Sequence, residues 1–289
     1  MKQWYIDYVN QIERYLANCF SESTPWQPLY EAMRYSLLGG GKRIRPVLLL
    51  ECNRMVGGDT ERALPLAAAV EMIHTYSLIH DDLPAMDNDN FRRGRPTCHI
   101  KFGEAMAILA GDALQAAAFR QVLSADLPED VRCRAGLVLA RAAGEDGMVA
   151  GQVLDLEGER RPLTDRELER VYKCKTAALI QAAATMGLIA GGGTEAQIGA
   201  AERFARALGL AFQIKDDILD CVGDESQLGK PIGSDKESGK TTFITLYGLE
   251  KAEEMLQAET QAAKDALIGA FDDTERLLWL ADWLLERKH

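Results

Sequence analysis

Two groups of aspartates lie far apart in the chain, in patterns that suit metal and phosphate chemistry. The first is in HDDLPAMDNDNFRRG (80–94), with Asp81, Asp82, Asp87 and Asp89. The second is in FQIKDDILD (212–220), with Asp216, Asp217 and Asp220. Sites built only from carboxylate oxygens suit hard cations such as Mg²⁺, which usually bridges to substrate phosphates. One such group alone is more often an exposed acidic turn, but two groups on separate apolar helices indicate a metal site.

The spacing within each group predicts how its carboxylates are placed. Asp81 and Asp87 would lie about 240° apart on an unbroken helix, so they could not share a ligand there. Pro84 disfavours helix continuation, and we expect the chain to fold back at this point and bring them together. Asp216 and Asp220 lie about 40° apart on a helix, and Gln213 shares their face.

Basic residues that could hold phosphate occur in three places besides the polar segment 223–240. GGGKRIRP contains Lys42, Arg43 and Arg45, and its spacing is not that of a Walker P-loop. Arg92 and Arg93 directly follow the first aspartate group, and adjacent residues point apart, so each could serve a different phosphate. Lys175 and Thr176 interrupt an apolar helical segment, where polar groups need a partner. Each base alone could be a solvated surface charge, and it is their grouping with the acids that indicates a site.

The segments that carry these residues have helical periodicity. Apolar residues recur at spacings of three and four in 64–80, 105–123, 131–143, 165–190, 196–220 and 246–271. No segment alternates convincingly with the period of a strand, and no linker rich in Pro, Gly or Ser divides the chain. We therefore expect one all-α domain over residues 1–289. The polar segment 223–240, which contains Lys230 and Lys240, is either a lid over the site or a plain solvated connection.

The composition limits the classes of binding partner and the cellular compartment that we expect. The net charge of −11 argues against nucleic acid, so any anionic substrate must be held by local bases or metal ions. The six cysteines include no C-x-x-C pair, which favours a reduced, cytoplasmic setting. The first residues do not resemble a signal peptide, and no run of about 18 apolar residues predicts a membrane span.

The motifs as a set resemble those of the trans-isoprenyl diphosphate synthases. GGGKRIRP, HTYSLIHDDLPAMDNDNFRRGRPTCH, GDAL, GMVAGQVLDL, YKCKTAAL, FQIKDDILD and LGKPIGSDKESGKTTF occur in the family's order between about residues 30 and 245. The resemblance implies an isoprenoid synthase fold, a bundle of long helices around a deep central cavity, usually in a homodimer. It also implies a prenyltransferase that joins isopentenyl diphosphate to an allylic diphosphate with the help of Mg²⁺, with three ions expected per active site.

The resemblance assigns roles by position. Asp81 and Asp87 would bind Mg²⁺ on the allylic diphosphate with Asp82 in support, and Asp216 and Asp220 would hold a further ion. Contacts to the allylic substrate are expected from Arg92, Lys175, Gln213 and Lys230, with Lys240 on closure. The diphosphate of isopentenyl diphosphate is expected to bind Lys42, Arg45, His74 and Arg93. Thr176 and Gln213 would stabilise the allylic cation with their oxygens. His74 alone on an apolar helix could instead be structural.

The length of the product depends on where the cavity ends. The resemblance places that floor at Tyr76 and Ser77, just before the first aspartates. Ser77 lies about 40° from Asp81 on the helix wheel, whereas Tyr76 lies about 140° away and could instead pack between helices. A bulky Tyr76 is typical of farnesyl diphosphate synthases, so we expect that product, with geranylgeranyl diphosphate as the alternative. A metal-dependent phosphohydrolase using His80 and Asp81 is a rival from another class, but it needs more histidine ligands.

Overall fold

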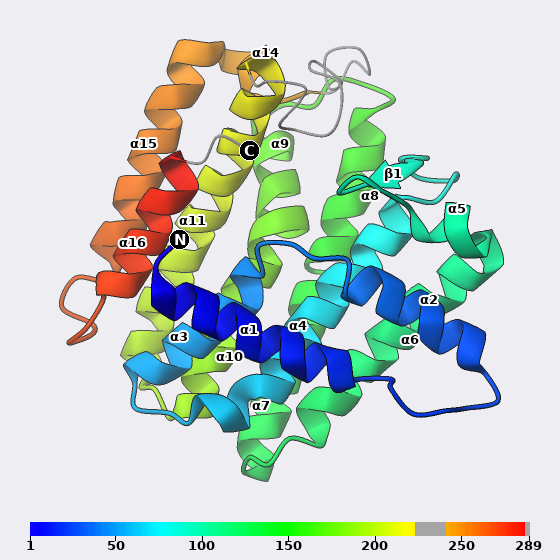
Figure 1. Cartoon of the computed structure of the whole chain (residues 1–289). Coiled ribbons are helices and arrows are strands. Elements are labelled where there is room, and N and C mark those ends of the chain that lie inside the picture. Colours follow the sequence, from blue (N-terminus) through cyan, green and yellow to red (C-terminus); the bar gives the residue numbers. More distant parts are fainter. Residues whose placement is uncertain (223–240, 287–289) are drawn as a thin grey trace.

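The computed structural model describes residues 1–222 and 241–286, and these residues are mostly helical (Figure 1). The elements are α1 (Gln3–Asn18), α2 (Gln27–Leu37), α3 (Ile44–Met55), α4 (Thr60–Asp81), β1 (Phe91–Arg92), β2 (Arg95–Pro96), α5 (Cys98–Phe102), α6 (Glu104–Leu123), α7 (Glu129–Ala143), α8 (Met148–Gly158), α9 (Asp165–Val171), η1 (Tyr172–Ala177), α10 (Ala178–Gly191), α11 (Glu195–Val222), α14 (Phe243–Tyr247), α15 (Leu249–Ala266) and α16 (Glu275–Glu286). The all-α prediction is therefore confirmed. The two short strands pair antiparallel, with Arg92 opposite Arg95.

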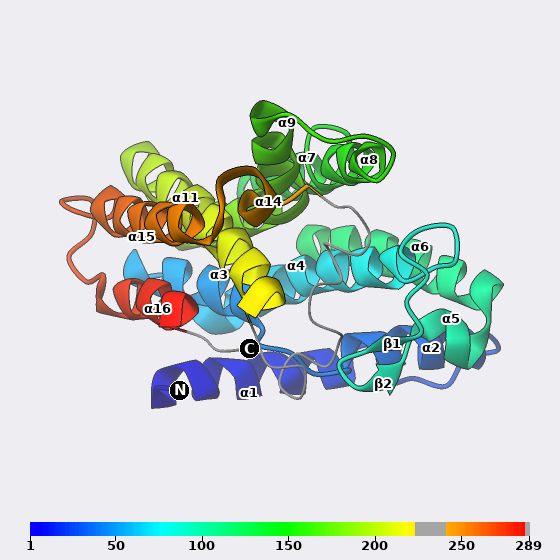
Figure 2. The same ribbon diagram turned by 90° about the horizontal axis from the view of Figure 1, so that it is seen from above.

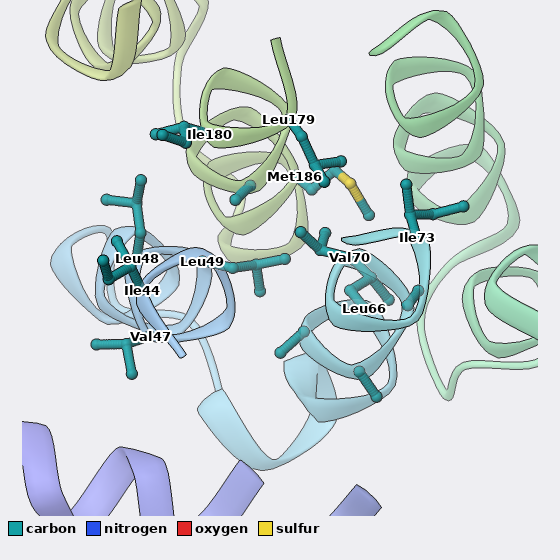
Figure 3. Packing of buried hydrophobic residues seen from close by; sticks show 14 of the residues in the cluster. Ile44, Val47, Leu48, Leu49, Leu66, Val70, Ile73, Leu179, Ile180 and Met186 are labelled. Atoms are coloured by element: carbon teal, nitrogen blue, oxygen red, sulfur yellow. The ribbon is translucent and has the colours of Figure 1, made fainter. Parts of the chain in front are cut away.

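Helix α10 lies at the centre of the bundle and packs against α3, α4, α7 and α11. It is almost wholly apolar because neighbours cover most of its surface. Leu179 and Met186 of α10 meet Leu49 of α3 and Val70 of α4 in the main core (Figure 3). Viewed from above, α1 and α2 lie on one side of α3, α4 and α6, while α8, α9 and α15 lie on the other (Figure 2).

Helix α4 carries the first aspartate group at its C-terminal end. Its N-terminus is capped by Asp59, whose side chain accepts a hydrogen bond from the Glu61 amide at 2.9 Å. The helix ends at Asp81, three residues before Pro84, where the sequence predicts a break. The C-terminal end of α11, with the second group, points to the same side of the bundle (Figure 1).

The segment 165–190, expected as a single helix, contains a π-helical turn. Residues Tyr172–Ala177 form η1 between α9 and α10, and this turn contains Lys175 and Thr176. Gly151 of α8 lies against it, and a Cβ on Gly151 would come within 2.3 Å of the Lys175 amide nitrogen. A π-helical turn inside a helix is often found at a functional site, because it changes the direction of the side chains around it.

One stretch, Asp165–Gly191, is long and apolar enough to cross a membrane by length and composition. However, 67% of its most apolar window is buried inside the fold. The stretch comprises α9, η1 and α10, and α10 is the central helix described above. Its apolar character is thus explained by its place in the core.

Candidate active site

A cavity of about 550 Å³ opens at the C-terminal end of α4. Its walls come from α3, α4, α6, α8 and η1 and the turn after α4. The polar groups on its lining include Arg45, His74, His80, Asp81, Gln152, Lys175 and Thr176. The apolar part includes Leu83, Met86, Ile108, Met148, Val149, Val153 and Leu156. The cavity therefore joins a charged region to an apolar region, as a ligand with an ionic head and a hydrocarbon tail requires.

The first aspartate group folds back as the sequence predicts. The Asp87 amide donates a hydrogen bond to the Asp81 carbonyl at 2.9 Å, and the Met86 amide donates to the Leu83 carbonyl at 2.9 Å. This turn places Asp87 beside Asp81. Burial raises the pKa of Asp81 to about 6; the charge of Asp87 adds to this rise, and Lys175 opposes it. A carboxylate in such surroundings gains stability from a bound cation.

The structure places Asp82 differently from its neighbours. Asp82 is buried, and its carboxylate forms an ion pair with Arg92 at 2.6 Å. The Arg92 guanidinium also lies 3.7 Å from the carboxylate of Asp89. The position of Arg92 is therefore fixed by two acids of the first group, and Arg92 lines a smaller pocket with Asp82 and Arg93.

A basic cluster lies beside the charged region of the cavity. The pKa of His74 lies well below its usual value, because of burial first and then the nearby charges of Arg45 and Arg93. Burial also lowers the pKa of Arg45, while the charge of Asp216 opposes this change. Arg93 donates from Nη1 to the Gly40 carbonyl, beside the GGGKRIRP segment. The structure thus brings these bases together from three segments of the chain. Asp216 is close enough to Arg45 for its charge to affect the pKa of the guanidinium.

Arg43, between the predicted phosphate ligands, points into the protein instead. It has a φ of 54° and is buried, and its Nη1 atom lies 2.5 Å from Glu71 Oε1. Its Nε donates to Glu13 at 2.7 Å. Lys42, the next residue back, is partly exposed, and its carbonyl accepts a hydrogen bond from the Tyr5 hydroxyl at 2.5 Å. Arg43 therefore anchors the segment that carries Lys42 and Arg45.

The second aspartate group lies on the last turns of α11. Asp216 and Asp220 are both partly exposed, whereas Asp217 is buried. Gln213, one turn earlier, accepts a hydrogen bond from the Thr176 hydroxyl at 3.0 Å. The predicted pair of Thr176 and Gln213 is therefore in direct contact. Lys230 and Lys240 lie outside the described residues.

Two polar residues on α8, one lining the cavity and one bound to Lys175, were not assigned a role from the sequence. Asp155 forms an ion pair with Lys175 at 2.6 Å. Gln152, which lines the cavity, has a buried side-chain nitrogen without a hydrogen-bond partner among the described residues. An acid and an amide three residues apart in the apolar motif GMVAGQVLDL are the signal that could have identified them, because such groups need partners when buried.

The predicted floor residues Tyr76 and Ser77 both line the cavity. Tyr76 is buried, and burial raises the pKa of its phenol. Its ring meets the His80 ring edge-on at 5.8 Å, and His80 Nε2 lies 3.1 Å from the Ile108 carbonyl. His80 is therefore held between α4 and α6, where it supports Tyr76.

The residues present fit a hard divalent cation that arrives with a phosphate ligand. Within 1–222 and 241–286, no three His, Cys, Asp or Glu side chains converge as a ready-made metal site. Mg²⁺ needs only one or two carboxylates when substrate phosphates and waters complete its shell. Asp81, Asp87 and Asp216 carry carboxylate oxygens, the kind of ligand that such a cation prefers, and they are the residues that would hold it.

Comparisons with known proteins agree with this geometry. The family described as Polyprenyl synthetase matches residues 27–274. The chain is 49% identical to a farnesyl diphosphate synthase of Geobacillus stearothermophilus, over 90% of this chain and 89% of that protein. It is 48% identical to a large subunit of a heterodimeric geranylgeranyl pyrophosphate synthase of Arabidopsis thaliana, over 90% of this chain and 72% of that protein.

The fold matches solved structures of the same kind. The geranylgeranyl pyrophosphate synthetase of Pyrococcus horikoshii superposes with a TM-score of 0.89 at 35% identity, covering 99% of this chain and 97% of that one. This likeness extends over all the elements that line the cavity. The chain is an enzyme of the polyprenyl synthetase family.

Proposed function

We propose that the protein is a prenyltransferase that condenses isopentenyl diphosphate with dimethylallyl diphosphate and then with geranyl diphosphate, giving farnesyl diphosphate. The cavity carries this proposal. It places acids and bases at one end and an apolar wall at the other, as a growing prenyl diphosphate requires. The farnesyl diphosphate synthase among the relatives supports the reaction and the product.

Asp81, Asp87 and Asp216 would hold Mg²⁺ with the allylic diphosphate, assisted by Asp82 and Asp220. When bound, the ions would neutralise the departing diphosphate; we expect three per active site. The ion pair with Asp82 supports a role for Arg92 on the same diphosphate, since it holds the guanidinium in one position close to the first aspartates. Lys175, also at this end of the cavity, would bind the allylic diphosphate too.

The chain's own residues account for the remaining chemistry. Arg45, His74 and Arg93, with Lys42, would hold isopentenyl diphosphate beside the allylic substrate. As the allylic C–O bond breaks, the Thr176 and Gln213 oxygens would stabilise the cation that forms. The alkene carbon of isopentenyl diphosphate then bonds to that cation, and a proton leaves to the released diphosphate. The apolar walls would limit the access of water, which would otherwise capture the cation.

The product length is a proposal that rests on Tyr76. A buried aromatic side chain on the cavity wall, supported by His80, limits the depth available to a prenyl tail. Geranylgeranyl diphosphate is the second candidate, favoured by the 48% identity to the Arabidopsis subunit. Purified protein incubated with both five-carbon diphosphates and Mg²⁺, with products separated by chromatography, tests the reaction and distinguishes fifteen from twenty carbons.

We further propose a homodimer in the cytoplasm, with residues 1–289 as one domain. Large apolar side chains are exposed on α6, α7 and α8, and an uncovered group of this kind favours a protein partner. They are Leu109, Leu123 and Leu137, together with Ile108, Val149 and Val153, which also line the cavity. All six cysteines are free thiols, in keeping with a reduced compartment. Light scattering on the purified protein gives the mass: a monomer would contradict the dimer.

A further inference from the structure

A chain of hydrogen bonds links the buried Asp217 to the cavity wall. The Gln213 side-chain nitrogen donates to Asp217 Oδ1 at 3.3 Å. The Thr176 hydroxyl donates to Gln213 Oε1 at 3.0 Å. Thr176 lines the cavity, so the chain connects the middle acid of the second group to the place where the allylic substrate reacts.

The other oxygen of Asp217 is held by two further donors. The Tyr172 hydroxyl, at the start of η1, donates to Oδ2 at 2.8 Å. The Phe243 backbone amide, at the start of α14, donates to the same atom at 3.0 Å. Asp217 is 5% exposed, so its carboxylate joins η1, α11 and α14 inside the protein.

We propose that Asp217 is a positioning residue that fixes the direction of this chain, so that Thr176 presents lone pairs, and not its proton, to the allylic substrate. An ionised carboxylate can only accept hydrogen bonds. Gln213 must therefore turn its amide nitrogen to Asp217 and its oxygen to Thr176. Thr176 has one proton, and it must donate that proton to Gln213.

The direction matters for a reaction through a cation, and the proposal rests on the proposed function in this respect. A hydroxyl that gives its proton to Gln213 has only acceptor lone pairs left for the cavity. Oxygen lone pairs stabilise positive charge, whereas an O–H bond pointing at it would be repulsive. The arrangement exists before substrate binds, so no reorganisation is needed during the reaction.

The near-isosteric change Asp217→Asn is expected to reverse the chain. Tyr172 and Phe243 would keep the Asn oxygen, which leaves the Asn amide nitrogen facing Gln213. Gln213 would then have to turn over, offering its oxygen to Asn and its nitrogen to Thr176. Thr176 would accept that bond, and its proton would point into the cavity.

The kinetic test compares Asp217→Asn, Thr176→Val and the double variant. We expect Asp217→Asn to lower kcat by about ten- to a hundredfold. The KM values for both substrates and the Mg²⁺ concentration needed for half-maximal rate should stay within about twofold of the wild-type values. In the Thr176→Val background the same change should have little further effect, because the hydroxyl it acts through is gone. Leu256→Ala is the matched control, because Leu256 lies in the apolar cluster that also contains Tyr172 and Phe243. Its effect on kcat should add to that of Thr176→Val.

Two kinetic results would overturn the proposal. An equal loss of kcat in both backgrounds would make Asp217 merely structural. A large rise in the Mg²⁺ requirement would make it a metal ligand.

Neutron crystallography of the deuterated wild-type protein gives an answer that does not depend on activity or on the folding of a variant. The two amide deuterons of Gln213 are expected on the Asp217 side, and the Thr176 deuteron between Thr176 and Gln213. Deuterons of Gln213 facing Thr176 would refute the inference even in an active enzyme. If the wild type made no prenyl product, the proposed function would fail, while the neutron result would still decide the direction of the chain.

Discussion

Lys175 Nζ lies 2.6 Å from Asp155 Oδ2, with the two side chains 24% and 12% exposed. Gly151, one turn before Asp155, allows α8 to approach η1 closely enough for this ion pair. Lys175 is thus fixed before any substrate binds. Asp155 also contributes to the raised pKa of Asp81, so it lies within electrostatic reach of the first aspartate group.

This ion pair makes Asp155→Asn informative. Without the carboxylate, Lys175 loses its charged partner and a defined position, so we expect kcat/KM for the allylic substrate to fall about tenfold or more, a loss of about 1.4 kcal/mol of transition-state stabilisation. The KM for isopentenyl diphosphate should not change, because its proposed ligands lie on other elements. Steady-state kinetics with each substrate varied in turn measures both. An equal rise in both KM values would show that Asp155 supports the whole site.

The metal assignment predicts large effects from single carboxylates. Asp81→Ala, Asp87→Ala or Asp216→Ala should each lower turnover by about a hundredfold or more, because each removes a ligand that stabilises the leaving diphosphate. The fold should survive, since Asp81 is a buried acid whose charge is already disfavoured. Circular dichroism checks the fold. A folded Asp81→Ala enzyme with near-normal activity would show that the metal lies elsewhere.

Arg92 and Arg93 are expected to affect different substrates. Arg92 is paired with Asp82 near the first aspartates, whereas Arg93 bonds to Gly40 beside the GGGKRIRP segment. Arg92→Ala should therefore raise mainly the KM for the allylic substrate, and Arg93→Ala mainly that for isopentenyl diphosphate, each about tenfold. The two variants serve as controls for each other. Identical effects of both changes on both substrates would rule out this division.

Tyr76→Ala should lengthen the product. Removing the buried ring opens apolar space next to Ser77, so elongation can continue to twenty carbons or more. Chromatography of the prenyl products, with Ser77→Ala as a matched small-to-small control on the same wall, measures the shift. If an active Tyr76→Ala enzyme still stops at the wild-type length, the floor is formed elsewhere, and α6 around Ile108 is the next place to test.

His74 should make the protein less stable in mild acid. Its pKa is lowered in the folded state by burial and by Arg45 and Arg93, whereas in the unfolded chain it is about 6.5. As the pH falls below about 6.5, the unfolded state binds a proton that the native state does not, so the free energy of unfolding decreases.

The matched measurement is urea unfolding of the wild type and His74→Gln between pH 7.5 and 5.5. The free energy of unfolding of His74→Gln should depend less on pH than that of the wild type, since the glutamine side chain does not titrate. Asp81, with its raised pKa, acts in the opposite direction between about pH 4 and 6, but it is present in both proteins and cancels in the comparison. Parallel curves for the two proteins would mean that His74 titrates normally in the fold.

The sequence by itself determined the features that depend on local geometry. Pro84 ends α4 and turns Asp87 back to Asp81, and this follows from the missing amide and the ring of proline. Helical spacing placed Gln213 on the face of Asp216 and Asp220, and Gln213 does reach Thr176. The family motifs, which are short stretches of sequence, identified the reaction.

Only the tertiary structure decided which charged groups pair with one another. Lys175 pairs with Asp155, and Arg92 pairs with Asp82. Arg43 turns inward to Glu71, although it lies between the basic residues Lys42 and Arg45. A helix wheel left Tyr76 undecided, because it gives an angle about one axis and not the position of the neighbouring helices. The packing of α4 against α6 places that ring on the cavity wall. The three ion pairs join residues 10, 20 and 28 positions apart, beyond the three or four positions that helical spacing relates.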